Sequence, residues 1–586
     1  MTEMKDILRL NANPAEGLRL DCTWNGCLAE LTLTNTSQNA CRVSDLTLFT
    51  ADMPFAPDTK VYGEGYSKLA QYGGTVTDCR LTGSYSDYKH YRFPKPDGVQ
   101  QVYNMAVFSP DGQAPVLIGF ASCHRFCGCI RFNETLLQVA LNCENITVDA
   151  GETIRLEQIY AEQGDKNKIL KHFAAAIAEN HPKLDFPEIP SGWCSWLVYG
   201  ANVTAENIYD NLRAIRQHNL DLKYIQIDDG YQAHMGDWLD CTDKFKGGVK
   251  QVCLDIKAQG FEPAMWVAPF IAEKNSNVFT EHPDWFVKDD DGNPLCSADV
   301  TFGGWRCGPW YMLDPTHPEA LEHLKTVFRT MHDEWKVTYY KLDANMWGAM
   351  PFGHRYDDTK TSVEAYRIGM AAIVEAAGSD SFILGCNAPM WPSIGAVHGM
   401  RVTNDNTRRW DRFTHLAREC FTRNWQNGNL WINDPDTVLL QNKITSVVGP
   451  DGTETFAEGS VTRDEFLFNA AYTMASGGMV LSSDNIAALR EENAAILGKL
   501  LPPVPTAAEF DDDSYTVGKA VLDDGRTMLY VFNFTDDERE IRVPLHGKTA
   551  VLDLFEDTDM GVTDDGIVFT RFAPHSAKVL VCRAVD

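Results

Sequence analysis

Two acidic residues follow two short apolar runs, and their placement suits acid–base chemistry on a glycoside. Asp343 follows the strand candidate Tyr339–Leu342, and Asp405 follows the strand candidate Met400–Thr403. If both runs are strands of one barrel, the two carboxyl groups meet at its rim. A pair of carboxyl groups around one bond is what hydrolysis of a glycosidic bond requires.

A lysine and an amide accompany the first acid. In an extended segment side chains two apart share a face, so Lys341, Asp343 and Asn345 are expected to project together. Lys341 has an alternative role as the Schiff-base lysine of an aldolase-type barrel. The neighbouring carboxylate of Asp343 argues against it, because a close negative charge stabilises the ammonium and raises its pKa. We therefore expect Lys341 to donate hydrogen bonds to ring hydroxyls.

Other strand candidates also end in groups that suit a sugar. Asp228 and Asp229 precede a glycine, and paired carboxylates accept hydrogen bonds from several hydroxyls, although either aspartate could instead cap a helix. Trp266 is a candidate stacking platform, with an ordinary core position as the alternative. Arg306 lies in the aromatic loop Gly303–Trp310. A loop of this length is expected to form a lid or wall, with an ordinary surface role for the arginine as the alternative.

Three further rim groups receive simpler interpretations. A nucleophilic Cys386 would need a general-base histidine, and the nearest one, His398, does not follow a strand candidate. Asp434 and Asp436 are expected to cap a helix or to support the site from behind. For Asp405 the alternative is a structural ion pair with the arginines that follow it. The motifs of metalloproteases, serine hydrolases and P-loop proteins do not occur in the sequence.

The middle of the chain alternates between apolar strands and helical patterns. Helical candidates include Ala205–Gln217, Pro318–His332 and Val363–Ala377. A doubly wound sheet is the alternative, but no G-x-G-x-x-G follows a strand. Eight strand units over about three hundred residues predict a (β/α)8 barrel with its catalytic groups at the carboxyl ends of the strands. The eight strand candidates are Gly192–Leu197, Tyr224–Asp228, Glu262–Val267, Tyr339–Leu342, Phe382–Gly385, Met400–Thr403, Asn429–Ile432 and Gly478–Leu481.

Both ends of the chain show short alternating strands separated by turn residues. This pattern is typical of antiparallel sandwiches and predicts one before the barrel and a smaller one after it. A helical segment near Asn167–Asn180 and a proline-bearing stretch precede the barrel. We predict a multidomain protein: an N-terminal β-sandwich over 1–185, a central TIM barrel over 186–500, and a small C-terminal antiparallel β-sandwich domain over 501–586.

Composition narrows the possible partners. The formal net charge of the 586 residues is −29, which disfavours nucleic acids and anionic membrane surfaces but suits neutral substrates. No run approaches eighteen apolar residues, and residues 1–6 lack the features of a secretory signal, so a cytoplasmic location is expected. The 16 cysteines are expected to be reduced and mostly buried. Cys123, Cys127 and Cys129 match no common zinc spacing, and no metal or organic cofactor is expected.

With these residues in place, the chain resembles glycoside hydrolase family 36, the microbial α-galactosidases and α-N-acetylgalactosaminidases. The resemblance covers essentially the whole chain. It rests on five short motifs in barrel order: Trp193-Cys194-Ser195-Trp196, Gln226-Ile227-Asp228-Asp229-Gly230-Tyr231, Lys341-Leu342-Asp343, Leu384-Gly385-Cys386, and Gly399-Met400-Arg401 with Asp405.

The resemblance implies a role for each rim residue. Asp343 would be the nucleophile and Asp405 the general acid/base. Asp228 and Asp229 would hold the 4- and 6-hydroxyls, with Trp266 as the wall beneath. The resemblance also implies substrate contacts from Lys341, Arg306, Cys386, Asn387, Arg401 and Trp196.

Two departures from the family pattern concern specificity. Tyr66 stands where the family's N-terminal loop usually presents tryptophan to the site, and Asn387-Ala388-Pro389-Met390 replaces a glycine-rich run near the 2-substituent. We therefore expect a 2-hydroxyl on the sugar, with a 2-acetamido group as the alternative.

The expected function is a retaining, exo-acting α-galactosidase on small neutral glycans. Asp343 would stay ionised beside Lys341, and Asp405 would keep its proton near neutral pH through burial or a nearby negative charge. The alternatives are an α-N-acetylgalactosaminidase with the same groups and a non-catalytic carbohydrate-binding barrel. The sequence does not indicate an oligomeric state.

Overall fold

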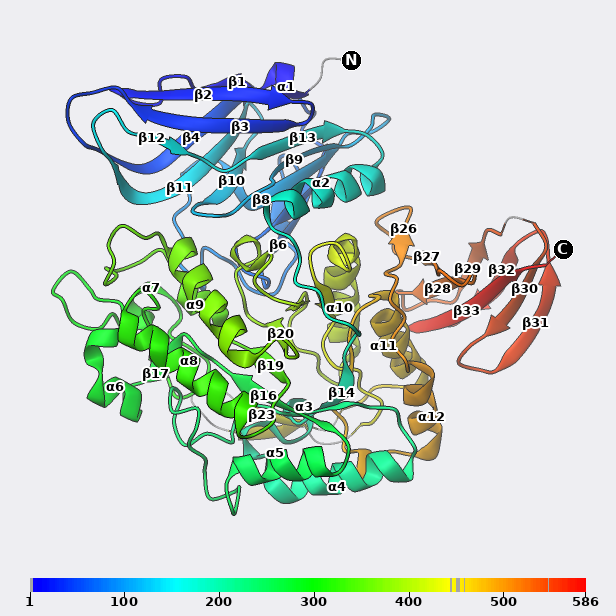
Figure 1. Ribbon diagram of the computed structural model, residues 1–586. Helices are drawn as coiled ribbons and strands as arrows, with labels where there is room; N and C mark the ends of the chain where they lie inside the picture. Colours follow the sequence, from blue (N-terminus) through cyan, green and yellow to red (C-terminus); the bar gives the residue numbers. More distant parts are fainter. Residues whose placement is uncertain (1–3, 443–444, 449–453, 458, 546, 586) are drawn as a thin grey trace.

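The computed structural model describes residues 4–442, 445–448, 454–457, 459–545 and 547–585. Figure 1 shows three parts in chain order: a β-rich N-terminal part, a barrel surrounded by helices, and a β-domain at the C-terminal end. The predicted multidomain architecture is confirmed. The exact boundaries at 185/186 and 500/501 stay predictions. Of the stretch used to predict the lack of an export signal, residues 1–3 lie outside the described residues.

The N-terminal part is one antiparallel sheet of 13 strands. The hairpin of β5 and β6 pairs with β8 and projects toward the barrel (Figure 1). Helix α2, Lys166–Asn180, follows the sheet and begins at Asp165, whose carboxylate accepts a hydrogen bond from the Lys168 N–H at 3.1 Å. The strands used below are β5 (Lys60–Glu64), β6 (Gln71–Thr75) and β8 (Gln100–Ser109).

The central sheet has eight parallel strands in the order β22-β21-β20-β19-β16-β15-β14-β25. Its two ends meet where the Met479 N–H donates to the Asn433 carbonyl at 2.9 Å, which closes the barrel. These strands are buried on both faces, as expected for parallel strands covered by helices. Their bounds are β14 Ser191–Cys194, β15 Tyr224–Ile227, β16 Glu262–Val267, β19 Tyr339–Leu342, β20 Phe382–Gly385, β21 Gly399–Arg401, β22 Ile432–Asp434 and β25 Val480–Ser482.

Several of the helices around the barrel begin at a side-chain cap. Thr204 and Thr361 form capping boxes at the starts of α4 and α9, each satisfying two backbone N–H groups. The three predicted helices are confirmed within one residue at each end. The helices that cover the barrel are α4 Ala205–Gln217, α5 Val249–Ala258, α8 Pro318–Asp333, α9 Ser362–Ala377, α10 Trp410–Thr422, α11 Arg463–Ala475 and α12 Glu491–Lys499.

All eight predicted strands exist, but several end earlier or later than the sequence pattern indicates. The first strand stops at Cys194 because helix α3, Trp196–Tyr199, begins directly after it. The fourth strand has the predicted bounds and stops at Leu342, but Ala344 then adopts a left-handed backbone with φ 52°. The alternation therefore ends, and the prediction that Asn345 projects beside Asp343 is wrong: Asn345 lies in a short 3-10 helix, η3, and is fully buried.

The C-terminal domain is a small sandwich. A sheet of six strands, β26-β27-β28-β33-β30-β31, packs against the two-stranded sheet of β29 and β32. Their shared core includes Leu529, Ile541 and Phe572. The strands at its centre are β28 Thr527–Asn533, β30 Thr549–Asp553 and β33 Ser576–Ala584, and the smaller sheet joins β29 Arg539–Val543 to β32 Ile567–Phe572.

The cysteine prediction is confirmed. The structure describes all 16 cysteines, joins none of them in a disulfide, and buries most of them. Cys127 donates to the Asn104 amide oxygen at 3.1 Å inside the N-terminal core. Among the residues that the structure describes, no helix is both long enough and apolar enough to cross a membrane.

Candidate active site

Asp343 stands at the carboxyl end of β19 with both carboxylate oxygens engaged. The indole N–H of Trp266 donates to its Oδ2 at 3.1 Å, and the Ala344 N–H donates to its Oδ1 at 2.7 Å. Its own backbone N–H bonds the Val267 carbonyl of the neighbouring strand at 2.8 Å. Two donors to this carboxylate, one from each of two neighbouring strand ends, fix its orientation.

Trp266 has a more specific role than the predicted stacking wall. The ring lies on β16, only 1% of its surface is exposed, and it meets Trp238 edge to face with centroids 5.8 Å apart. A ring buried to this extent offers little open face to a sugar. Its observed contribution is the N–H that orients Asp343.

Lys341 pairs with Asp228 rather than with Asp343. Its ammonium donates to Asp228 Oδ2 at 3.0 Å, and both side chains are buried. Burial opposes the charge on Lys341, but Asp228 outweighs it and holds the pKa well above the usual range. A permanently charged lysine is a poor amine nucleophile, which argues against the Schiff-base alternative.

Asp228 is further fixed by its neighbours on the rim. The side-chain amide of Gln226 donates to Asp228 Oδ2 at 2.6 Å, and the Asp228 N–H donates to Ser195 Oγ at 2.9 Å. The Asp229 N–H donates to Asp228 Oδ1 at 2.9 Å. Helix capping is therefore not what Asp228 does here. It belongs to a polar network that links β14, β15 and β19.

Arg306 forms an ion pair with Asp229, the residue that follows Asp228. Its Nε donates to Asp229 Oδ2 at 3.0 Å and its Nη2 donates to Oδ1, a forked pair. The indole of Trp310 donates to the Arg306 carbonyl at 2.8 Å and so anchors the aromatic loop. The surface alternative for Arg306 is wrong, and the loop reaches the barrel rim as the lid interpretation requires.

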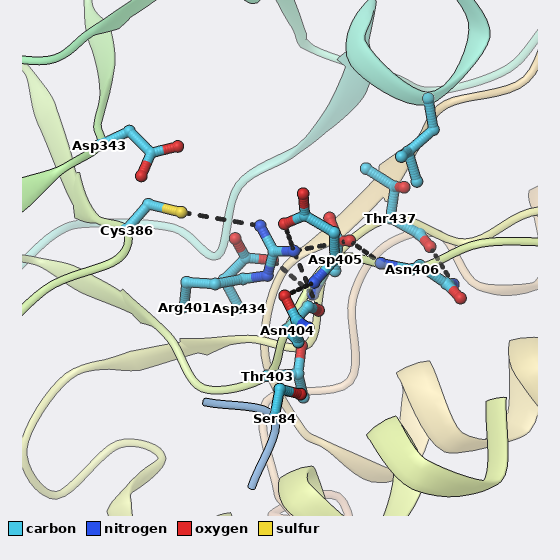
Figure 2. A network of polar contacts seen from close by, with 12 residues as sticks. Ser84, Asp343, Cys386, Arg401, Thr403, Asn404, Asp405, Asn406, Asp434 and Thr437 are labelled. Atoms are coloured by element: carbon cyan, nitrogen blue, oxygen red, sulfur yellow. Dashed lines mark hydrogen bonds and ion pairs between the residues drawn. The ribbon is translucent and has the colours of Figure 1, made fainter. Parts of the chain in front are cut away.

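Asp405 lies in the loop after β21 and shares one arginine with Asp436. Arg401 Nη2 donates to Asp405 Oδ1 at 2.8 Å and contacts Asp436 Oδ2 at 2.6 Å. Figure 2 shows this network beside Asp343 and Cys386. Arg401 is 1% exposed, whereas half of the Asp405 side chain is exposed. Arg401, predicted to bind substrate, thus contacts the second acid directly.

The expected proton on Asp405 is not what this arrangement favours. Burial raises the pKa of Asp405, but Arg401 and then Lys68 outweigh that effect and lower it to about 2. The prediction that burial or a nearby anion keeps Asp405 protonated is therefore wrong for the unliganded site. The physical reason is the guanidinium bonded to the carboxylate.

Cys386 and Asn387 continue the rim after β20. Cys386 is 2% exposed, and burial raises the pKa of its thiol to about 12, which excludes a thiolate nucleophile at neutral pH. Arg401 Nη1 lies 3.8 Å from its sulfur. Asn387 accepts a hydrogen bond from the Tyr91 hydroxyl at 2.7 Å. Both residues therefore lie in the same rim region as Asp343 and Arg401.

Of two further predicted substrate contacts, Tyr66 lies away from the site, and the contact from Trp196 stays a prediction. The Tyr66 hydroxyl donates to the Ala349 carbonyl at 2.8 Å, and the residue is 3% exposed, so its ring is part of the domain interface. A substrate contact from Tyr66 is not supported, because its only polar group is engaged. Trp196 opens α3 at the end of β14 and is half-buried at the rim.

Sequence reasoning missed Lys68. This lysine follows Tyr66 in the loop between β5 and β6, and its ammonium reaches the Thr403 carbonyl at 2.8 Å. Burial lowers the pKa of Lys68, while Asp405 and Asp343 both act to raise it. The two acids therefore share one cationic neighbour from the N-terminal domain. Lys68 directly follows the segment Gly63–Ser67, in which only Tyr66 was considered as a contact to the site.

Comparisons with known proteins find similarity to glycosidases. The melibiase family model matches residues 204–381. The mouse myogenesis-regulating glycosidase is 30% identical over 161 residues, 27% of this chain and 22% of its own length. The A type blood α-D-galactosamine galactosaminidase of Flavonifractor plautii is 27% identical over 323 residues, 50% of this chain. The match covers 29% of that protein, so this chain spans less than a third of either relative.

Among solved structures, the family 36 α-galactosidase AgaA of Geobacillus stearothermophilus superposes with a TM-score of 0.68 at 13% identity. The match covers 97% of this chain and 81% of that one, which extends the likeness of fold across all three parts. The chain therefore matches the melibiase model over residues 204–381, is similar in sequence to an α-galactosidase of Escherichia coli (28% identical over 139 residues), and shares the fold of a family 36 α-galactosidase.

Proposed function

We propose that this protein is a retaining, exo-acting α-galactosidase that removes terminal α-linked galactose from small neutral glycans. The observation that carries the proposal is that Asp343 and Asp405 follow strands β19 and β21 at one barrel mouth (Figure 2). The relatives named as α-galactosidases support the substrate class. The acidic net charge of −29 suits a neutral glycan.

The proposed reaction has two displacements. Asp343, oriented by Trp266, attacks the anomeric carbon while Asp405 gives its proton to the departing glycosidic oxygen. Asp405 then takes a proton from water, which attacks the glycosyl-enzyme and releases the sugar with retained configuration. A retaining enzyme requires the two carboxyl groups about 5–5.5 Å apart around the bound sugar.

The remaining rim groups would bind the sugar. Asp228 and Asp229 are held by Lys341 and Arg306, so each pair presents a fixed acceptor and a fixed donor. Such preformed pairs suit the recognition of sugar hydroxyls such as the 4- and 6-hydroxyls. No step of the proposed reaction needs a metal or an organic cofactor, and a cytoplasmic location stays a prediction.

Replacing the nucleophile tests the proposal. Asp343→Ala should abolish hydrolysis of an aryl α-galactoside, and external azide should restore turnover with the β-galactosyl azide as product. The exposed Asp358→Ala serves as the matched carboxylate control and should retain wild-type rates. Wild-type activity in Asp343→Ala would contradict the assignment. Sugar binding without turnover by the wild-type protein at any pH would favour the non-catalytic barrel.

An α-N-acetylgalactosaminidase is the second candidate. The Flavonifractor plautii relative is named as a galactosaminidase, and the run Asn387–Met390 departs from the family's glycine-rich pattern near the 2-substituent. Rates on the aryl α-galactoside and the aryl α-N-acetylgalactosaminide, measured side by side, distinguish the two. We expect the galactoside to be the faster substrate.

A further inference from the structure

One guanidinium nitrogen at the rim has more acceptors than hydrogens. Arg401 Nη2 lies 2.8 Å from Asp405 Oδ1, 2.6 Å from Asp436 Oδ2 and 3.1 Å from the Asn404 carbonyl. A terminal guanidinium nitrogen carries two N–H bonds, so three acceptors cannot all be well satisfied. The two carboxylates therefore compete for the same donor.

The rest of the Arg401 side chain is poorly satisfied. Its Nε is buried and has no hydrogen-bond partner among the residues that the structure describes. Its Nη1 has only the long contact with the Cys386 sulfur at 3.8 Å. A guanidinium with idle donors can change its partner without losing many bonds. The side chain is thus suited to move between two acids.

Asp436 is built into this position. It follows β22, has a left-handed backbone with φ 70°, and is 6% exposed. The Asn406 N–H donates to its Oδ2 at 2.5 Å, and the Asp436 N–H donates to Asp434 Oδ1 at 2.9 Å. These bonds hold the carboxylate against Arg401 whatever Asp405 does.

The charged and titratable groups around the two acids come from several elements. Those acting on Asp436 or Asp405, or acted on by them, are Arg401, Asp434, Lys68, Lys341, Cys194, Tyr85 and Tyr472. Burial raises the pKa of Asp436 to about 6, with Arg401 opposing and Asp405 reinforcing the rise. Two acids that share one cation titrate as a pair. Between the two pKa values of the pair, the two carboxyl groups together hold one proton.

We propose that Asp436 is a positioning residue for proton transfer, which takes Arg401 away from Asp405 when that carboxyl must carry a proton. The proposal rests on the proposed glycosidase function. In the resting site Arg401 is shared. When Arg401 pairs with ionised Asp436 alone, Asp405 loses its cation and accepts a proton from solvent, to which half of its side chain is exposed.

The glycosylation step that follows needs no further reactant. The proton of Asp405 passes to the glycosidic oxygen as the bond from that oxygen to the anomeric carbon breaks. The Asp343 carboxylate forms the new bond to that carbon, and the aglycone leaves as a neutral alcohol. Asp405 is then anionic, and Arg401 can return to it until water is activated.

The test is Asp436→Asn with two α-galactosides of different leaving-group ability. A dinitrophenyl galactoside needs no protonation to depart, whereas a methyl galactoside does. With the rival anion removed, Arg401 should bind Asp405 alone. We expect kcat/KM at pH 7 to fall at least about tenfold for the methyl galactoside, because each unit of pKa lowering reduces the protonated fraction about tenfold. For the dinitrophenyl galactoside, kcat/KM should fall less than about threefold.

The pH profile gives a second readout. In the wild type, kcat/KM for the methyl galactoside should fall as pH rises through about 6, where the pair loses its shared proton. In Asp436→Asn this limb should move to lower pH, and Asp436→Glu, which keeps the charge, should restore it toward the wild-type position. If the asparagine variant does not fold, the wild-type profiles decide: a limb near 6 in the methyl galactoside alone supports the proposal, and identical limbs in both substrates overturn it.

A purely structural role predicts a different pattern. Asp484→Asn is the matched control, because Asp484 is also buried and bonds Arg408 at 2.8 Å. It should lower both rates by the same factor. Equal losses on both substrates in Asp436→Asn would overturn the inference while leaving the proposed function intact. Failure of the wild type to hydrolyse either galactoside would instead overturn the proposed function.

Discussion

At the scale of single residues, the acids of the barrel mouth depend on cationic partners from other strands and loops. Asp343 and Asp405 each follow an apolar run of the sequence, and both lie at the barrel mouth. The pairing of Lys341 with Asp228 and of Arg306 with Asp229 joins residues far apart in the chain. No local spacing in the sequence indicates such pairs. From the sequence alone, Asp343 was therefore the expected partner of Lys341, whereas the observed partner is Asp228.

Lys68 should tune the acid. Because its ammonium lowers the pKa of Asp405, removal of that charge should raise it. We expect Lys68→Met to move the basic limb of kcat/KM for a methyl galactoside up by about one pH unit. Lys68→Arg keeps the charge and is the control, with an unchanged limb. A basic limb that stays in place in Lys68→Met would show that the lysine does not act on Asp405.

At the scale of elements, the barrel strands were predictable because parallel strands buried on both faces read as short apolar runs. The strand ends were less predictable. The left-handed backbone at Ala344 and the immediate start of α3 at Trp196 depend on packing at the rim. The resemblance at Tyr66 pointed to the loop between β5 and β6, but its path into the barrel is set by long-range bonds such as that from the Lys68 N–H to the Ala388 carbonyl at 3.0 Å.

Asp87 holds that loop and should make stability depend on pH. Its carboxylate accepts the N–H groups of Tyr66 and Ser67 at 2.9 and 3.1 Å, and burial raises its pKa to about 7 from 3.8. The folded state thus binds the proton more tightly. This contribution to stability is complete below pH 3.8 and is lost as pH rises through about 7.

Asp87→Asn should remove that dependence. We expect the fall in melting temperature between pH 5 and pH 8 to be smaller in the variant than in the wild type, as measured by calorimetry. Asp78→Asn, a substitution of an exposed aspartate in the turn between β6 and β7 (Cys79–Leu81), is the control. An unchanged slope in Asp87→Asn would mean that Asp87 does not carry the proton.

At the scale of the whole molecule, a buried ion pair between Arg423 and Glu64 helps to hold the N-terminal domain against the barrel. We call this pair the clamp. Arg423 and Glu64 are both fully buried, with Nη2 and Oε2 2.6 Å apart. The same guanidinium donates to the carbonyls of Lys68 at 2.5 Å, Ala70 at 3.0 Å and Val402 at 2.7 Å. The clamp therefore joins the β5–β6 hairpin to the barrel beside Lys68.

Breaking the clamp should be costly. Glu64→Gln leaves the Arg423 charge buried without its partner, and we expect the free energy of unfolding to fall by about 3–5 kcal/mol. Asp52→Asn removes one partner of the exposed Arg9–Asp52 pair and should have no measurable effect. Denaturant titration measures both. Equal stability of Glu64→Gln and the wild type would show that the interface does not depend on this pair.

The account depends most on Asp343 and Asp405 serving the same anomeric carbon. With a dinitrophenyl α-galactoside, Asp405→Ala should form the glycosyl-enzyme quickly and release it slowly, because no base activates water. Peptide mapping by mass spectrometry should then find one hexosyl group on Asp343. A hexosyl group on another residue, or rapid turnover by Asp405→Ala with no trapped sugar, would contradict the account.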